Sequence, residues 1–151
     1  MKSNIIFLVV FLIAAFLIYK WKNPTANFNA DKKEGIQFYR GTWQTAIEKA
    51  AKENKLIFLD IYASWCGPCK RLKNNVFSDT KVGGYFNATF INISLDGEKA
   101  EGEMLADRYK VSGYPTLLFL NKHGDVVSQV SGYYDADELI KLGEEAVKQG
   151  L

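Results

Sequence analysis

Two cysteines offer the most direct chemistry in this sequence. Cys66 and Cys69 are the only cysteines among its 151 residues, and two positions separate them. A disulfide between them closes a very short loop and constrains little of the unfolded chain, so a purely stabilising bridge explains the pair poorly. Two thiols one helical turn apart can instead exchange a disulfide with another molecule. The spacing therefore predicts redox-active thiols that form the disulfide Cys66–Cys69.

The residues around the cysteines predict a role for each thiol. An apolar run over residues 56–63 ends just before Cys66, and Pro68 suits the first turn of a helix, where a missing N–H costs nothing. The unpaired N–H groups at the start of that helix favour a thiolate on Cys66. Cys69 faces the same side one turn later. We therefore expect Cys66 to be the nucleophile and Cys69 to be the resolving thiol.

Asp60 interrupts the apolar run six residues before Cys66. A carboxyl group that points into the core has a raised pKa, which suits Asp60 to accept or return the proton of Cys69. The alternative is an exposed aspartate at a sheet edge. The apolar neighbours on both sides, 57–59 and 61–62, leave little room for water and favour the buried position. Asp60 is the predicted proton carrier.

A metal site is the competing interpretation of the two cysteines. A structural zinc site takes four ligands, and besides the cysteines this chain has one histidine, His123, in a predicted turn. Zinc within one chain is therefore not expected, although a cluster shared between two chains would have enough ligands. We expect no metal and no other cofactor, and we interpret His123 as a solvated turn residue.

The elements that must position these residues alternate between strands and helices. The apolar run at 56–63 is typical of a strand buried in a parallel sheet, and the apolar repeat after the N-cap Thr42 is typical of an amphipathic helix. The predicted strands are 36–40, 56–63, 89–95, 116–120 and 126–130, and the predicted helices are 43–53, 66–77, 98–109 and 135–149. This order, βαβαβαββα, predicts an α/β fold with a mixed central sheet flanked by helices.

An uncharged apolar stretch, residues 5–19, precedes the folded part of the chain. Lys2 precedes it and Lys20-Trp21-Lys22 follows it, which suits two membrane interfaces, so residues 5–21 are predicted to cross the membrane once. A cleaved signal peptide is the main alternative, although the residues that follow the stretch make a poor cleavage site, and a buried core helix is a third. The chain then divides into an anchor or signal segment (1–22), a polar linker (23–34) and a folded domain (35–151).

The net charge excludes one class of partner. The formal charge is +2, but three of the 19 Lys and Arg residues flank the apolar stretch, which leaves 16 against 17 Asp and Glu. A folded domain with a net charge of −1 has no basic surface for nucleic acid. We therefore expect no nucleic-acid partner.

The residues around the cysteines resemble the thioredoxin family. The family signature Trp-Cys-Gly-Pro-Cys-Lys is unaltered at residues 65–70, and the resemblance extends over residues 35–149. Asp60 occupies the family's buried-acid position, and Gly132 follows the last strand as in the family. The resemblance implies the thioredoxin fold, with residues that support the active site at Trp65, Gly67, Pro68, Lys70 and Tyr62.

The resemblance also implies where a client polypeptide binds. The segment 113–116 stands where the family places a cis-proline opposite the cysteines, so Tyr114, Pro115 and Thr116 are the implied residues of the client groove. Two residues depart from the family pattern. Tyr62 replaces the usual tryptophan, and Asn92 replaces a lysine near the buried acid, which implies that the proton transfer is tuned differently.

The N-terminal stretch and residues 69–79 are more similar to membrane-attached bacterial relatives, including the thioredoxin-like domain of the disulfide-reductase transporters. That similarity implies a domain on the extracytoplasmic side of the membrane, which is the periplasmic side in a Gram-negative cell. A secreted form follows if the N-terminal segment is cleaved. The implied partners are client proteins with disulfides and a membrane electron donor of the reductase-transporter type.

The Gly-Pro pair between the cysteines resembles that of reducing thioredoxins, so the implied activity is protein-disulfide reduction. A reductase outside the cytoplasm depends on a membrane donor, because no glutathione buffer supplies electrons there. Two alternatives stay open. One is an oxidase or isomerase of the same fold, and the other is a non-catalytic, membrane-tethered adaptor that carries the cysteines passively.

Overall fold

The computed structural model of the protein describes residues 10–18 and 34–150. Residues 10–18 form a helix with exposed apolar side chains such as Phe11 and Leu17. No helix among the described residues combines the length and the apolarity needed to cross a membrane. Parts of the predicted anchor (5–21) and nearly all of the predicted linker (23–34) lie outside the described residues, so both stay predictions.

Four strands form one mixed sheet in the order β2-β1-β3-β4. The central strand β1 (Leu56–Tyr62) pairs in parallel with β2 (Phe90–Asp96) and antiparallel with β3 (Thr116–Leu120). Strand β4 (Val126–Ser131) pairs antiparallel with β3. This confirms the predicted mixed sheet with its closing hairpin. All seven residues of β1 are buried, which explains why its sequence is almost continuously apolar.

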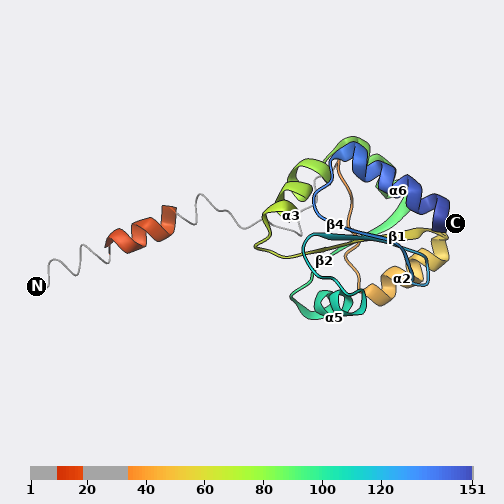
Figure 1. The fold of residues 1–151 in the computed structure, drawn as a ribbon, viewed down its shortest axis with the longest axis horizontal. Coiled ribbons are helices and arrows are strands. Elements are labelled where there is room, and N and C mark those ends of the chain that lie inside the picture. Colours follow the sequence, from red (N-terminus) through yellow and green to blue (C-terminus); the bar gives the residue numbers. More distant parts are fainter. Residues whose placement is uncertain (1–9, 19–33, 151) are drawn as a thin grey trace, which may run out of the picture.

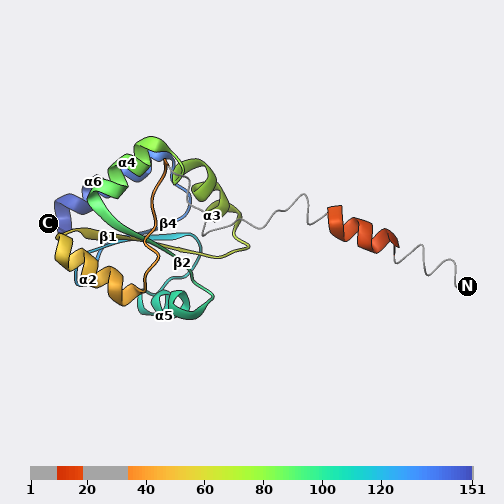
Figure 2. The ribbon, with the colours of Figure 1, turned by 180° about the vertical axis from the view of Figure 1, so that it is seen from behind.

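Helices cover both faces of the sheet (Figure 1, Figure 2). On one face lie α2 (Trp43–Glu53) and α5 (Ala100–Arg108), and on the other lie α4 (Thr80–Thr89) and α6 (Ala136–Gly150). The helix that follows β1 is short, α3 (Gly67–Arg71), and continues as the π-helix η1 (Leu72–Val76). The single helix predicted over 66–77 is therefore two pieces of different geometry.

The predicted first strand, 36–40, is wrong, because the structure has no strand there. The backbone N–H groups of this segment donate to unrelated acceptors. Ile36 N donates to the carbonyl of Phe77 (2.7 Å), and Tyr39 N donates to the carbonyl of Asn92 in β2 (2.7 Å). A single bond to β2 does not make a ladder, so the order of elements in residues 34–150 begins with α2.

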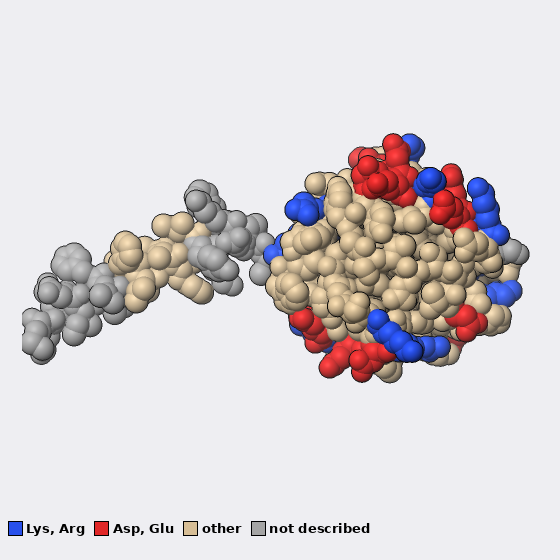
Figure 3. Space-filling model, in the orientation of Figure 1, with Lys and Arg blue, Asp and Glu red and all other residues tan. Residues whose placement is uncertain are grey.

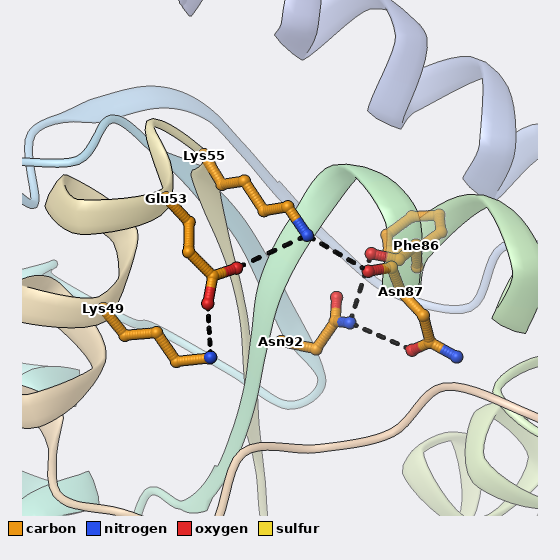
Figure 4. Close-up of polar contacts among 6 residues, drawn as sticks. All are labelled: Lys49, Glu53, Lys55, Phe86, Asn87 and Asn92. Atoms are coloured by element: carbon orange, nitrogen blue, oxygen red, sulfur yellow. Dashed lines mark hydrogen bonds and ion pairs between the residues drawn. The ribbon is translucent and has the colours of Figure 1, made fainter.

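Two asparagines attach this segment to α4 and β2. Figure 4 shows the contacts that Asn87 and Asn92 make with each other, with Phe86 and with Lys55. Asn87 Oδ1 accepts from the backbone N–H of Gln37 (2.8 Å) and from Nδ2 of Asn92 (3.3 Å). The same Nδ2 also donates to the carbonyl of Phe86 (3.2 Å), and Lys55 Nζ donates to the carbonyl of Asn87 (3.4 Å). Side-chain amides thus take the place of the strand pairing that the sequence predicted.

The sheet separates two cores of different composition. The first core is rich in phenylalanine, with Phe58 packed edge-on against Phe86, and it lies between the sheet and η1, α4 and α6. The second is mainly aliphatic, includes Ile57 and Leu59, and lies between the sheet and α2 and α5. Because side chains alternate along a strand, Asp60 shares the face of Phe58. The acid therefore lies on the face that carries the helix of the cysteines.

Candidate active site

The two cysteines form a disulfide at the start of α3. Cys66 is the N-cap residue, and its Sγ accepts a hydrogen bond from the backbone N–H of Cys69 (3.1 Å). The Cα atoms of the bonded pair are 5.3 Å apart, and each residue is only 2% exposed. Pro68 lies in the first turn of the helix, as predicted. One N–H of the first helical turn therefore donates to the first sulfur, which is an arrangement that favours a thiolate there.

Asp60 is buried on the face of the sheet that carries η1, with 3% of its surface exposed. Its Oδ2 accepts a hydrogen bond from the hydroxyl of Ser94 (2.7 Å), while its Oδ1 has no partner among the described residues. Burial raises the pKa of Asp60 to about 7, against the opposing effects of the Ser94 hydrogen bond and the Lys73 charge. A carboxyl group with this pKa can both take and return a proton near neutral pH.

Tyr62 packs with the cysteines and with Tyr114 in a small cluster. The phenol replaces the tryptophan that the family places here, and it is 9% exposed. Burial raises the pKa of Tyr62 to about 12, and the charges of Asp96 and Asp60 add to the effect. Tyr62 therefore stays neutral at physiological pH and packs with the disulfide rather than acting as a proton donor.

An aromatic and acidic rim flanks the disulfide on the side of α5. Trp65 is 66% exposed, and its indole N–H donates to both carboxylate oxygens of Glu98 (3.0 and 3.1 Å). Its ring lies edge-on to Tyr114 at 6.2 Å between centroids. Burial raises the pKa of Tyr114, and so do the charges of Glu98, Asp96 and Glu103. The rim therefore presents two aromatic rings backed by carboxylates.

The loop opposite the cysteines contains the cis bond Tyr114-Pro115, as the resemblance implied. The carbonyl of Pro115 accepts from the N–H of Gly132 (3.0 Å), which ties the loop to the end of β4. Thr116 is fully buried, and its hydroxyl bonds to the carbonyl of Gly113 (2.8 Å) and to the hydroxyl of Ser131 (2.9 Å). Thr116 thus holds the loop from within, while Tyr114 is the partly exposed member.

The opposite flank of the disulfide carries cations. The guanidinium of Arg71 lies over the ring of Tyr133 at 5.6 Å, and Tyr133 follows the Gly132 that bonds to Pro115. Lys70 is half-buried directly after Cys69. Figure 3 shows blue side chains at the upper left and red ones at the lower left of the domain, with uncharged surface between them.

Two residues of this site were not predicted from the sequence. Ser94 contacts Asp60 only through the register of two strands, and no local motif signals that pairing. Glu98 was assigned only to the acidic start of a helix, and no sequence pattern connects it to the indole of Trp65. His123 is an exposed turn residue, as predicted, and no group of three or more potential metal ligands occurs among the described residues.

Comparison with known proteins decides the family. A family model described as a thioredoxin-like domain matches residues 43–146. The chain belongs to this thioredoxin-like family. A solution structure from Bacteroides thetaiotaomicron that carries the provisional name of a disulphide-isomerase is 44% identical, with a TM-score of 0.68, and the match covers 78% of this chain and 97% of that one.

Proteins named DsbD supply further relatives. The thiol:disulfide interchange protein DsbD of Yersinia pestis is 29% identical over 142 residues, which is 91% of this chain and 24% of that protein. The reduced C-terminal domain of Neisseria meningitidis DsbD is 26% identical with a TM-score of 0.58, and the match covers 68% of this chain and 92% of that domain. The chain therefore spans about a quarter of the length of the curated relatives and resembles their thioredoxin-like domain.

Proposed function

We propose that this protein is a thiol:disulfide oxidoreductase that reduces the disulfides of client proteins on the extracytoplasmic side of a membrane. The observation that carries the proposal is the Cys66–Cys69 disulfide at the N-terminus of α3, with a buried carboxyl group, Asp60, in the strand that precedes it. Family membership and the likeness to DsbD proteins support the same chemistry. The Gly-Pro pair between the cysteines supports the reducing direction.

The reaction proceeds in two exchanges. The thiolate of reduced Cys66 attacks a client disulfide, so that one sulfur of the client is bonded to Cys66 and the other leaves as a thiolate that takes up a proton. Asp60 then accepts the proton of Cys69, whose thiolate attacks the Cys66 sulfur. The mixed disulfide breaks, the Cys66–Cys69 bond forms, and the second client thiolate takes up a proton. Two electrons have passed from the protein to the client.

The rim residues support the first of these exchanges. Tyr114 and Trp65 form an exposed aromatic surface next to a sulfur that is itself almost buried. A client segment that lies along Tyr114 and Pro115 brings its own sulfur to Cys66 without opening the core. Gly67 and Lys70 lie next to Trp65 at the edge of this surface. The hydroxyl of Thr116 hydrogen-bonds to the carbonyl of Gly113 and so holds the loop that carries Tyr114 and Pro115.

The proposal includes a membrane anchor and a membrane electron donor. The uncharged stretch 5–19, with lysines on both sides, supports a single-pass anchor over residues 5–21. Each turnover leaves the disulfide oxidised, so a membrane donor of the reductase-transporter type must return two electrons. The likeness to DsbD proteins supports a donor of this kind. A cleaved, secreted form is the alternative arrangement.

A Cys69→Ser variant of the full chain, expressed in its native membrane, tests the proposal. Without the resolving thiol, Cys66 should retain clients as mixed disulfides that a chemical reductant releases. The matched control is the double variant Cys66→Ser, Cys69→Ser, which has no thiol. Trapping by the single variant and not by the double one supports the enzyme. Partners that stay bound to the double variant indicate an adaptor.

Isomerase or oxidase activity is the second candidate, and the name of the Bacteroides relative favours it. Equilibration of the full chain with glutathione buffers separates the two directions. A reductase should have a reduction potential near that of thioredoxin, about −270 mV, whereas an isomerase or oxidase lies at roughly −180 to −120 mV. A value in the higher range contradicts the reductase proposal.

A further inference from the structure

The buried acid has one well-defined partner across the sheet. Parallel pairing of β1 and β2 places Asp60 opposite Ser94, and the Ser94 hydroxyl donates to Asp60 Oδ2 at 2.7 Å. Both residues lie on the face that carries η1, α4 and α6. Oδ1 is equally buried but has no hydrogen-bond partner among the described residues. The two oxygens of one carboxyl group are therefore in different environments.

The other polar side chain on this face of β2, Asn92, donates hydrogen bonds to groups other than Asp60. Asn92 precedes Ser94 by two residues, so the two side chains point to the same side. Its amide nitrogen donates to the carbonyl of Phe86 and to Oδ1 of Asn87, which turns the group toward α4. Asn92 thus secures α4, and Ser94 contacts the acid.

The charged and titratable groups around Asp60 come from two other positions. Lys73 on η1 is near enough for its charge to oppose the rise in the Asp60 pKa, although this effect is smaller than that of the Ser94 hydrogen bond. Tyr62, two residues along β1, stays neutral. From β3, the paired residue is Leu117, which brings no charge. Ser94 is therefore the neutral donor that most favours the ionised carboxylate.

We infer that Ser94 is a positioning residue of the proton transfer. Its hydroxyl donates a hydrogen bond to Oδ2 of Asp60, which leaves Oδ1 as the oxygen that receives the Cys69 proton. The inference rests on the proposed role of Asp60 as proton carrier. An oxygen that already accepts a hydrogen bond is the poorer site for a proton, so the O–H of Ser94 directs protonation to the other oxygen. It also keeps the carboxyl group in one rotamer.

The chemistry that this arrangement controls is the second exchange. A proton passes from the Cys69 thiol to Oδ1 of Asp60, and the resulting Cys69 thiolate attacks the Cys66 sulfur. The bond between Cys66 and the client breaks as the Cys66–Cys69 bond forms. The client leaves as a thiolate and takes a proton from water, and Asp60 later returns its own proton to Cys69 when the pair is reduced again. Ser94 exchanges no proton in any step.

The test is the pH dependence of client release from the mixed disulfide, measured on the full chain by rapid acid quench between pH 5 and 9. In Ser94→Ala the ionised carboxylate loses its donor, so the Asp60 pKa rises and the midpoint of the rate profile moves to higher pH by about one unit. Ser94→Thr keeps the hydroxyl and should keep the wild-type midpoint. A carbon-13 NMR titration of Asp60 in the oxidised chain should show the same shift without any turnover.

Asn92→Ala is the matched control, because it removes a buried polar side chain from the same strand face without touching Asp60. It should lower stability and leave the pH midpoint in place. The inference is overturned if Ser94→Ala leaves the midpoint and the NMR titration unchanged, or if Asn92→Ala moves them equally. If the proposed function fails, Cys66 forms no mixed disulfide with the client, and if only the role of Asp60 fails, Asp60→Asn leaves the pH profile intact.

Discussion

Asp60 and Glu98 show how the same chemical group, a carboxyl group, takes different roles in buried and exposed surroundings. Asp60 is buried and accepts the hydroxyl of Ser94, whereas Glu98 is exposed and accepts the indole N–H of Trp65. Burial brings the pKa of Asp60 to about 7, so its useful property is a proton that it can gain or lose. For the exposed Glu98 the useful property is its charge and the position that it gives to an aromatic ring.

The largest contrast should appear in the rate of client release. Asp60→Asn removes the base for Cys69, so release of the mixed disulfide at pH 7 should slow by about 100-fold. Glu98→Gln leaves the proton path intact and should change this rate by less than about twofold. Rapid-quench kinetics with a neutral disulfide peptide measure both. Equal slowing in the two variants contradicts the assignment of the proton to Asp60.

The two acids should also differ in how they affect stability with pH. The folded state holds a proton on Asp60 up to about pH 7, whereas an unfolded aspartate releases it near 3.8. The contribution of Asp60 to stability is therefore largest below pH 3.8 and is lost as the pH rises toward 7, by up to about 4 kcal/mol. Asp60→Asn should remove that fall and stabilise the protein at pH 8, while Glu98→Gln should retain it.

Denaturant unfolding of the oxidised protein at pH 4, 6 and 8 measures this slope. The disulfide should stay intact throughout, so that both variants refer to the same unfolded chain. A stability difference between the wild-type protein and Asp60→Asn that stays constant from pH 4 to pH 8 contradicts the buried, protonated state of Asp60.

The aromatic rim depends on a glycine next to Glu98. A Cβ atom on Gly97 would lie 2.6 Å from Cε1 of Tyr114 and 2.7 Å from Cγ2 of Ile61. Gly97→Ala should therefore displace the tyrosine and cost about 1–3 kcal/mol of stability. Reduction of a protein client should slow, while reaction with 2-hydroxyethyl disulfide should not, because the small disulfide does not need the rim. Gly84→Ala, which meets open space on α4, is the control.

The smallest expected effect concerns client charge. Glu98 and Glu103 are near enough to Tyr114 to raise its pKa, whereas Arg71 lies over the ring of Tyr133. A peptide disulfide with lysine beside its cysteine should react about two- to fivefold faster than its glutamate counterpart, and added salt should reduce the difference. Glu98→Gln should weaken this preference, whereas Glu144→Gln on the remote surface of α6 should not. A preference that is insensitive to salt argues against an electrostatic origin.

Much of the site could be predicted because its signals are local. The N-cap position of Cys66, the place of Pro68 in the first helical turn and the burial of Asp60 all follow from neighbouring residues or from one apolar run. The cis bond before Pro115 followed from the resemblance to the family. The strand expected at 36–40 failed because its N–H groups found acceptors in Phe77, Asn87 and Asn92, which are distant in sequence.

The reactive cysteine pair, the buried acid and the alternation of strands and helices could be predicted from the order of the residues, because periodicity and helix-capping rules act over a few residues. The remaining residues of the site became known only from the way that the strands and helices pack. Ser94 reaches Asp60 through the register of two parallel strands, and Glu98 reaches Trp65 across 33 positions of the chain. Such contacts depend on how whole elements pack, and no pattern within either segment contains that information.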